Sequence, residues 1–506
     1  MAATTIFKNT LFLYLRSFLT LVITLYTSRL VLLALGIEDW GIYSVVGGFV
    51  SMFGFLNASM SLSIQRYLSY EMTKNDGNVH HIFCQGMNII LFITLLLFLI
   101  IEICGSYYVL KILNVPENKR YLSFWVFQLS ALSLIFTTLR VPYSALTVAR
   151  ERLDIFAYMD IANSVLKLIF VLYLVYLPYR LLLYSSYFSL VVIVLFVTNK
   201  IICNKLFPES RNYVFNVDWI KSKEILGFTG WTTLSSVGMI LRDQAINLMF
   251  NNFLGLTVNA AYGIARQVSS SIQGFVSNVV VAFSPPIYKS YAAGDKEQTN
   301  RLLIVSSKLC SVLILLMFIP LYFEMDYILQ LWLKNVPDYT STICKYVVFV
   351  AALIFIAGNN AIVIRATGNV RQYELSVNVF NIIFLLVSYV LLVYGFSINY
   401  VFISLILITI IQLLYMLYLT SEILQTKSMN FIYEVICKLV ISVLPSVIIS
   451  NILCSMVDCF FRLLSIIVCS SISLIVCAYF LYLNNDEKKY VKQIIYSIKN
   501  KFICKK

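Results

Sequence analysis

The sequence predicts an all-α polytopic membrane protein built from two parallel six-helix repeats. Hydrophobic residues make up 60% of the chain and charged residues only 12%, with a mean hydropathy of +0.85. A soluble domain carries about 25% charged residues. Apolar stretches of about 20 residues follow one another along the whole chain. The third observation is a repeat, because Leu35-Gly36-Ile37 recurs as Leu254-Gly255-Leu256.

Apolar stretches of membrane-crossing length divide the chain into about 14 expected spans. A proline at Pro178 separates two of them, because proline has no amide hydrogen to continue a helix. The expected spans are 10–35, 41–64, 82–110, 122–146, 155–177, 180–199, 225–252, 259–284, 303–323, 342–364, 373–395, 400–420, 436–456 and 463–483.

The repeat extends beyond one tripeptide. Tyr43 corresponds to Tyr262, and Asn114-Val115-Pro116 recurs as Asn335-Val336-Pro337. Asn163 corresponds in the same way to Asn381. A unit of six spans starts and ends on one side of the membrane, so two copies are parallel and related by an axis along the membrane normal. We therefore expect an N-lobe at 1–215, a C-lobe at 216–420, and two extra helices with a basic tail at 421–506.

Lysine and arginine gather in alternate loops, beginning with the N-terminus and ending with the tail. The positive-inside rule therefore predicts that both termini are cytoplasmic. The net charge of +14 reflects this topology and contact with anionic lipid headgroups, and we expect no nucleic-acid partner. The longest polar connection, 199–224, joins the two halves on the cytoplasmic side, as either a hinge or a simple linker.

The sequence contains no arrangement typical of a cofactor site, a metal site or a catalytic site. The eleven cysteines include no CxxC pair, and the two histidines, His80 and His81, are adjacent with no spaced partner. No glycine-rich loop of the kind that cradles phosphates is present. We therefore expect no cofactor, no metal and no enzymatic activity.

Basic residues inside the expected spans are the main candidates for a substrate site. A charge at the bilayer centre costs about 2.5–3.5 kcal/mol on insertion scales, so such residues usually face the protein interior. Near span ends they can reach the headgroups instead, as Lys345, Lys308 and Arg140 could. The candidate substrate-binding cations are Arg16, Arg29, Arg140, Lys167, Arg242 and Arg266.

Polar residues at helical spacing accompany these cations. Tyr262, Ser270 and Gln273 share a face of one span with Arg266 and are expected to line the cavity. Hydrogen bonding that only joins helices is the alternative for such stripes. Asp160 and Asp243 are candidates for ion coupling.

Asp160 lies seven residues before Lys167, either as a structural ion pair or as part of a proton or sodium relay. Glu374, near a span end, is expected to be exposed.

Two stretches resemble a known family. They are Leu35–Tyr43 with Arg66–Glu71, and Ala261–Val268 with Pro285–Tyr288. They are similar to the polysaccharide-transporter branch of the multidrug/oligosaccharidyl-lipid/polysaccharide (MOP) flippase superfamily, which contains O-antigen and capsule repeat-unit flippases. The resemblance implies a MATE-like fold and alternating access between two lobes.

It also implies a substrate, an undecaprenyl-pyrophosphate-linked oligosaccharide moved from the inner to the outer leaflet of the bacterial cytoplasmic membrane. Membrane lipids, a coupling H⁺ or Na⁺ ion, and polysaccharide polymerase or assembly proteins would be its further partners. A pyrophosphate needs cationic groups, and arginine can bind it through two parallel hydrogen bonds.

Three other functions stay open. A drug or cation exporter of the same fold needs acidic groups, whereas the first span carries only Arg16 and Arg29 as ionisable residues. A lipid II flippase handles the same kind of anionic polyprenyl carrier. A membrane glycosyltransferase or polymerase usually needs a sizeable outer loop, and the longest one expected here is only about Glu324–Ser341.

Overall fold

The computed structural model describes residues 13–488 apart from short gaps. Arg29, Asn114, Val115 and Pro116 fall outside the described residues, as does the basic tail from 489 onward. The gaps are 14, 18, 21, 25, 28–29, 32, 37–38, 40, 44–45, 48–49, 51, 75–76, 113–116, 175, 334–335, 457–458 and 486.

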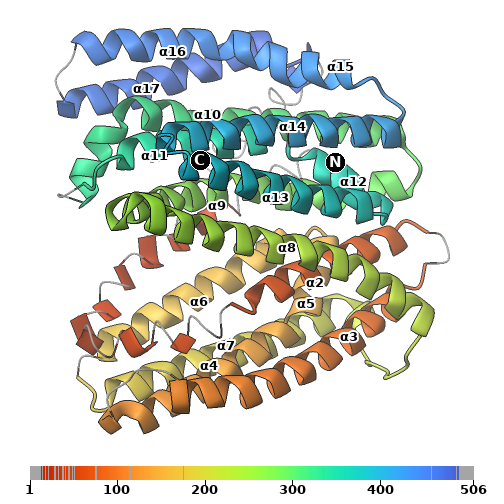
Figure 1. Ribbon diagram of the computed structural model, residues 1–506. Coiled ribbons are helices and arrows are strands. Elements are labelled where there is room, and N and C mark those ends of the chain that lie inside the picture. Colours follow the sequence, from red (N-terminus) through yellow and green to blue (C-terminus); the bar gives the residue numbers. More distant parts are fainter. Residues whose placement is uncertain are drawn as a thin grey trace, which may run out of the picture. The chain divides into compact units, whose positions relative to one another are not determined.

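The described chain contains helices and turns and no strand, so the predicted all-α class is confirmed (Figure 1). Among the described residues, ten helices are long and apolar enough to cross a membrane by length and composition. They coincide with ten of the expected spans. Of the other four expected spans, 10–35 and 41–64 include residues outside the described part of the chain, and 225–252 and 259–284 are more polar. Two of these are the long helices α8 (Trp219–Leu254) and α9 (Leu256–Ala292), each about 55 Å long and able to cross a core of about 30 Å.

The helices form two compact units. The N-terminal unit is 8–236, and the C-terminal unit begins at Val237, inside α8. The expected boundaries of the lobes at 215 and 420 stay a prediction. The N-terminal unit contains α2 (Gly54–Glu71), α3 (Val79–Ile100), α4 (Glu117–Leu139), α5 (Val141–Ala149), α6 (Leu153–Leu174) and α7 (Arg180–Leu206), with π-helical turns at Ile101–Gly105 and Tyr108–Ile112.

Apolar side chains hold the N-terminal unit together. One buried cluster includes Ile64, Phe83 and Leu146, and another includes Val46 and Phe127. Because lipid tails are as apolar as these side chains, the clusters hold the helices together by close van der Waals packing rather than by exclusion of water. Because the clusters draw on residues from most of the helices of the unit, they fix how the polar residues of those helices are arranged.

The C-terminal unit continues from α8 through α9 to a final hairpin. Its other helices are α10 (Lys296–Leu333), α11 (Thr340–Ala357), α12 (Asn360–Thr367), α13 (Arg371–Val393), α14 (Ile398–Leu424), α15 (Ser428–Phe431), α16 (Lys438–Met456) and α17 (Cys459–Cys477), with π-helical turns at Ile432–Cys437 and Ala478–Tyr482. Helices α16 and α17 pack on each other and on α10, at the upper edge of the unit in Figure 1.

The packing pattern repeats between the two units. In the first, α2 packs on α3 and α5, and α7 packs on α4 and α6. In the second, α9 packs on α10 and α12, and α14 packs on α11 and α13. The breaks repeat too, since α4 gives way to α5 at Arg140 and α11 gives way to α12 at Gly358. Six helices in the same order therefore make the same neighbours twice, as the sequence repeat predicts.

The connection between α7 and α8 is a packed element of the N-terminal unit. Its backbone carbonyl at Glu209 accepts a hydrogen bond from His80 Nδ1 at 2.8 Å. Its carbonyl at Asn216 accepts one from Gln85 Nε2 at 2.7 Å. Both donors lie near the start of α3, so hydrogen bonds hold the connection between α7 and α8 against that helix.

Asp218 ends this connection and caps α8. Its Oδ1 accepts hydrogen bonds from the amides of Ile220 and Lys221, and its Oδ2 lies 3.1 Å from His81 Nε2. The Lys221 amide and then His81 hold the pKa of the Asp218 carboxyl below its usual value. An aspartate in this position satisfies amides that the first turn of a helix leaves unpaired. The adjacent histidines therefore have a structural role here.

Helix α10 carries two buried charged residues that were expected in an outer loop or at the lipid headgroups. Glu324 was expected in an outer loop, but it lies inside α10, beside a kink that follows Pro320. Its carboxylate accepts two hydrogen bonds from Arg462 of α17, at 2.6 and 3.0 Å. The expectation that Lys308 reaches the headgroups was wrong, because Lys308 is only 2% exposed and lies within 3.3 Å of Glu434 and Glu487.

The expectation of an exposed Glu374 was also wrong. Its side chain is buried, and Oε1 accepts a hydrogen bond from Arg365 Nε at 3.2 Å. A carboxylate near a span end avoids the need for solvent when an arginine on the preceding helix reaches it. Position in the span alone could not reveal that partner.

The Glu324–Arg462 pair generates a stability prediction. Arg462→Met should destabilise the protein by about 3 kcal/mol, because it leaves the Glu324 carboxylate buried without its cation. Glu324→Leu with Arg462→Met should recover most of the loss. The measurement is thermal unfolding of the purified protein in detergent. As a matched control, Lys345→Met should cost under about 1 kcal/mol, because its partner Asp326 is 67% exposed. A single Arg462 variant as stable as the wild type would contradict the prediction.

Candidate functional site

In the N-terminal unit, two arginines converge on one aspartate. Arg16 Nη1 donates to Asp160 Oδ2 at 2.7 Å, and Arg140 Nη2 lies 3.6 Å from Asp160 Oδ1. The Arg16 guanidinium also lies 5.0 Å from the centre of the Phe156 ring. We call Arg16, Arg140 and Asp160 the N-cluster. Two guanidinium groups and one carboxylate give it a net charge of +1.

The helix break positions Arg140 in this cluster. Arg140 is the residue between α4 and α5, and Pro142 lies in the first turn of α5. Arg140 Nε is buried and has no hydrogen-bond partner among the described residues. A buried guanidinium donor left unpaired is costly, so this atom calls for an acceptor.

Lys167 does not pair with Asp160 in the described structure. Its Nζ lies over the ring of Phe188, 3.6 Å from the ring centre, which is a cation–π contact. The sequence left open an ion pair between Asp160 and Lys167 or a relay through them. The Asp160 carboxylate instead contacts the two arginines of the N-cluster.

In the C-terminal unit, a second pair of arginines converges on a second aspartate. Arg242 donates to Asp243 Oδ1 through Nε at 3.1 Å and through Nη2 at 2.9 Å. Arg266 Nη2 contacts Asp243 Oδ2. Arg242 Nη1 donates to Asn381 Oδ1 at 3.1 Å. We call Arg242, Asp243, Arg266 and Asn381 the C-cluster, and its net charge is again +1.

Asn381 carries an unpaired donor. Its Oδ1 must be the atom that faces Arg242, because a guanidinium group can only donate. The amide orientation is therefore fixed, and Nδ2 is left buried with no partner among the described residues. The C-cluster thus resembles the N-cluster in having one buried donor that lacks an acceptor.

The C-cluster lies deep inside its helices. Asp243 lies eleven residues from the end of α8, Arg266 ten residues from the start of α9, and Asn381 ten residues from the start of α13. At 1.5 Å per residue these positions are about 15 Å from the helix ends. That depth is about half of a hydrocarbon core of 30 Å.

Helix α9 presents a face without large apolar side chains. Gly263, Gln267, Ser270, Ser271 and Gly274 are exposed, and no large apolar residue of α9 beyond Leu256 is exposed. A methyl group added at Gly263 or Gly274 would meet no atom within 4 Å. Such a face does not suit lipid tails, so it suits a water-filled space.

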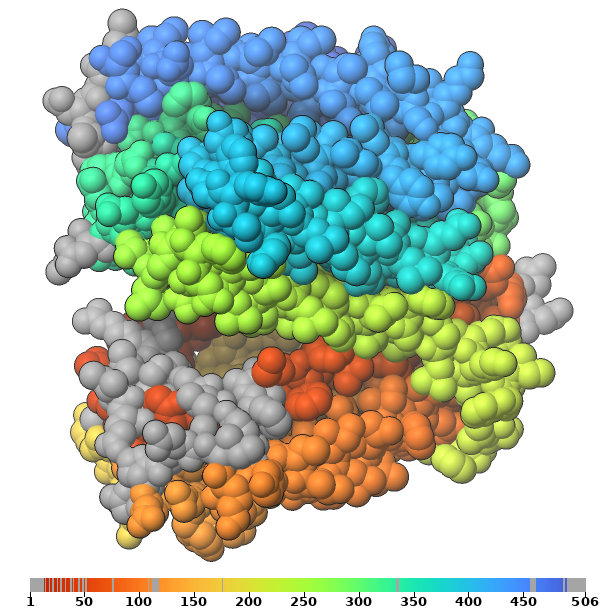
Figure 2. Space-filling view, viewed as in Figure 1, coloured from red at the N-terminus to blue at the C-terminus, as the bar shows by residue number. Residues whose placement is uncertain are grey.

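The outer helices show the opposite pattern. On α13, Ile382 and Leu386 are exposed, and on α14 so are Leu407 and Ile411. Both helices lie on the face of the C-terminal unit that is turned to the viewer in Figure 2, in teal to blue. Exposed apolar side chains along both helices indicate contact with lipid.

The predicted cavity residues of α9 lie in different environments. Ser270 is exposed, whereas Gln273 is half-buried and donates to Ser269 Oγ at 2.8 Å. Tyr262 is buried, in edge-to-face contact with Phe250 of α8 and tilted against Phe402 of α14. Arg266 has 42% of its side chain exposed and lies near Tyr262 and the open face.

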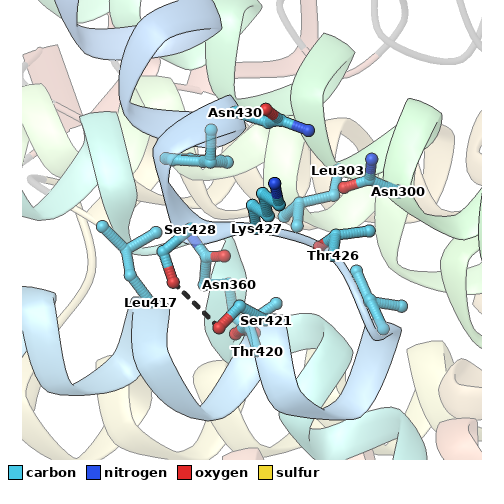
Figure 3. A pocket seen from close by; sticks show the side chains of 12 residues that line it. Asn300, Leu303, Asn360, Leu417, Thr420, Ser421, Thr426, Lys427, Ser428 and Asn430 are labelled. Carbon is cyan, nitrogen blue, oxygen red and sulfur yellow. Dashed lines mark hydrogen bonds between the residues drawn. The ribbon is translucent and has the colours of Figure 1, made fainter.

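Two recesses occur elsewhere in the C-terminal unit. Figure 3 shows a polar one between α14 and α15, where Lys427, Ser421, Ser428 and Asn360 meet; its volume of about 10 Å³ admits a single water molecule. The other is a groove of about 490 Å³, lined mainly by aromatic and aliphatic side chains of α10, α11, α14 and α16, with Lys345 among them. Its lining suits hydrocarbon rather than sugar.

Sequence reasoning identified the charged members of both clusters but not their pairing. Asn381 was recognised only as the counterpart of Asn163. The available signal was its position in the repeat, together with the cost of a polar amide deep in a span. That it completes the C-cluster depends on a contact between α8 and α13, which spacing along one helix cannot reveal.

Comparisons with known proteins agree on family and fold. The family model described as "Polysaccharide biosynthesis protein" matches residues 32–335, more than half of the chain. An uncharacterized membrane protein, EpsK, from Bacillus subtilis (strain 168) is 18% identical over 282 residues, which are 55% of each protein. The chain thus spans about half the length of the curated relative that it matches.

Solved structures of transporters have the same fold. A MOP superfamily transporter from Pyrococcus furiosus gives a TM-score of 0.71 at 10% identity, covering 83% of this chain and 96% of that one. An outward-facing multidrug resistance MATE family transporter gives 0.73 at 11%, covering 83% and 96%. A variant of the Vibrio cholerae MATE transporter VcmN gives 0.66 at 15%, covering 85% and 98%. The predicted resemblance and the MATE-like fold are therefore confirmed, and the chain belongs to the polysaccharide biosynthesis protein family.

Proposed function

We propose that this protein is a flippase that moves an undecaprenyl-pyrophosphate-linked oligosaccharide across the bacterial cytoplasmic membrane by alternating access. The observation that carries the proposal is that each unit brings two arginines and one aspartate together on helices expected to cross the membrane, with a net positive charge. Within the described part of the chain, each cluster also holds one buried donor without an acceptor. A diphosphate supplies both the negative charge and the acceptor oxygens.

The open face of α9 supports the sugar part of this substrate. Serine, glutamine and glycine beside Arg266 leave room and offer hydrogen-bonding groups to hydroxyls. Asn163 Oδ1 and Asn259 Oδ1 are buried acceptors without partners among the described residues. An oligosaccharide carries many hydroxyl donors, whereas most drugs carry few.

The charge argues against a drug or cation exporter. Such a pump needs free carboxylates, and both Asp160 and Asp243 already contact two arginines. A lipid II flippase carries the same diphosphate and differs only in the sugar, so the cellular readout must decide between them. The same proposal places both termini in the cytoplasm, and a coupling ion would act through Asp160 or Asp243.

One prediction of the proposed function concerns the arginines. Arg16→Ala, Arg242→Ala and Arg266→Ala should each reduce polysaccharide export at least about tenfold, because a charge-assisted hydrogen bond contributes about 1.5–3 kcal/mol. Lysine at these positions should retain part of the activity, since it keeps the charge but not the planar fork. The measurement is surface polysaccharide in a cell that lacks its own flippase, together with lipid-linked repeat units left on the inner leaflet.

Lys345→Ala is the control for these variants, because its partner Asp326 is largely exposed and lies outside both clusters. It should export normally. Each variant must be present in the membrane in wild-type amount. Normal export by all three alanine variants would reject the site, and restored peptidoglycan synthesis in place of surface polysaccharide would favour lipid II.

A second prediction of the proposed function tests the open face of α9. Gly274→Trp should block export without loss of stability, because the indole would project into the space beside Arg266 rather than into packed atoms. Gly274→Ala should export normally and stabilise the helix by about 0.5–1 kcal/mol. Export and thermal unfolding are measured in parallel. A fully active, folded tryptophan variant would show that the substrate does not pass this face.

A further inference from the structure

We propose that Asp243 is an internal stand-in for the substrate's phosphate, which the diphosphate displaces from Arg242 and Arg266 while about one proton is taken up. The inference rests on the proposed function and assigns Asp243 a positioning and gating role within that site. Its basis is the geometry of the C-cluster and the charges around it.

The Asp243 carboxylate occupies the groups that an anion would need. Its Oδ1 takes two donors from Arg242, and its Oδ2 takes a donor from Arg266. Both guanidinium groups are therefore held apart and aimed at one point between them. A phosphate group bridging two arginines would make the same contacts.

The carboxylate nevertheless leaves one donor of the cluster unpaired. Asn381 Nδ2 is buried, its orientation is fixed by Arg242, and neither oxygen of Asp243 serves it. A carboxylate has two oxygens, whereas each phosphate of a diphosphate ester offers more acceptor positions. The cluster therefore suits an anion with more oxygens than Asp243 provides.

The cluster is open enough for the exchange. The exposed fractions of the side chains are 20% for Arg242, 20% for Asp243 and 42% for Arg266. Arg266 borders the open face of α9, where Ser270 and Gly274 leave space. An anion arriving along this face meets Arg266 first and can then replace Asp243 without unfolding either helix.

The charges determine what happens to the displaced carboxylate. Two arginines and ionised Asp243 carry +1, and a diphosphate diester carries about −2. Binding would leave −1 if Asp243 stayed ionised, and zero if it took a proton from water. The groups that face Asp243 are Arg242, Arg266 and the Tyr262 hydroxyl. Uptake of one proton therefore keeps the occupied cluster neutral, whereas without it the cluster would hold an excess negative charge inside the membrane.

The N-cluster has the same layout. Asp160 lies between Arg16 and Arg140, and Arg140 Nε is the buried donor that the carboxylate does not satisfy. The two clusters share no corresponding residues in the repeat, because Arg266 corresponds to Gly47. An arrangement reached twice from different residues is better explained by a shared task than by shared ancestry of those positions.

The test measures proton linkage in the full-length protein in lipid nanodiscs. The probe is a ten-carbon isoprenyl diphosphate N-acetylglucosamine, whose diester phosphates do not titrate near pH 7. Calorimetric titration in two buffers with different heats of protonation gives the affinity and the protons taken up per probe. The wild type should take up about one proton. Asp243→Asn, which removes the competitor without changing shape, should bind at least about tenfold more tightly and take up none.

Two further variants keep the result interpretable. Asn381→Leu should weaken binding about tenfold in both the wild-type and the Asp243→Asn protein, because it removes the otherwise unpaired donor. Asp326→Asn removes a carboxylate that is 67% exposed and pairs with Lys345, and should change neither affinity nor proton count. Gel filtration and thermal unfolding check that each variant is folded.

The inference is overturned if Asp243→Asn binds no more tightly than the wild type, if both proteins take up the same number of protons, or if neither binds. If the Asp243→Asn protein binds the probe and the wild type does not, the inference is supported, because the Asp243 carboxylate of the wild type then outcompetes the probe. Transfer of the same probe between leaflets of proteoliposomes is scored separately. If the protein transfers the probe but binding takes up no proton, this inference is rejected and the proposed flippase function is retained. If binding takes up a proton but the probe is not transferred, the flippase function is rejected and the inference about Asp243 is retained.

Discussion

The constraint on which the rest of this structure depends is that a charge in the bilayer needs a partner supplied by the protein. Water is scarce there, so an arginine inside the membrane must find a carboxylate, an aromatic ring or a carbonyl. Arg16, Arg140, Arg242 and Arg266 reach aspartates, and Lys167 reaches a ring. Meeting these needs requires helices to approach at particular heights. The ion pairs therefore specify how the helices are aligned, while apolar packing stabilises them.

The charged groups of this membrane protein are of two kinds, which differ in whether their positive and negative charges balance. The buried pairs Glu324–Arg462 and Glu374–Arg365 match charge for charge, and the network around Lys308 likewise adds two lysines to two glutamates. Among the described residues, the N-cluster and the C-cluster each contain two arginines to one aspartate, and each contains one buried donor atom that has no acceptor. The balanced groups are electrically neutral as they stand and serve the fold. The unbalanced groups reach charge balance only when an anion from outside the protein binds to them.

Most of the fold could be predicted from the sequence, because hydropathy and the repeat report directly on helices and their order. Ten apolar helices of the described chain coincide with expected spans, and the more polar α8 and α9 were recovered as well. The charged residues of the candidate site were also recognisable, since their cost in a membrane is a property of residue type. Their partners were not. Asp160 reaches Arg16 and Arg140 rather than Lys167, Glu374 is buried against Arg365, and Asn381 joins Arg242, each through contacts between helices that helical periodicity does not encode.

The two buried charges of α10 have a consequence for how the protein is made. Lys308 and Glu324 enter the membrane when α10 is inserted, but Glu434, Arg462 and Glu487 lie 126, 138 and 179 residues later in the chain. During synthesis α10 must therefore remain among lipid or the translocation machinery until the final hairpin emerges. Until then Lys308 and Glu324 lack the partners that they have in the folded protein. The last helices thus act as a checkpoint on biogenesis: a chain truncated before them would present two orphan charges to quality-control proteases, although every residue of both clusters had already been made.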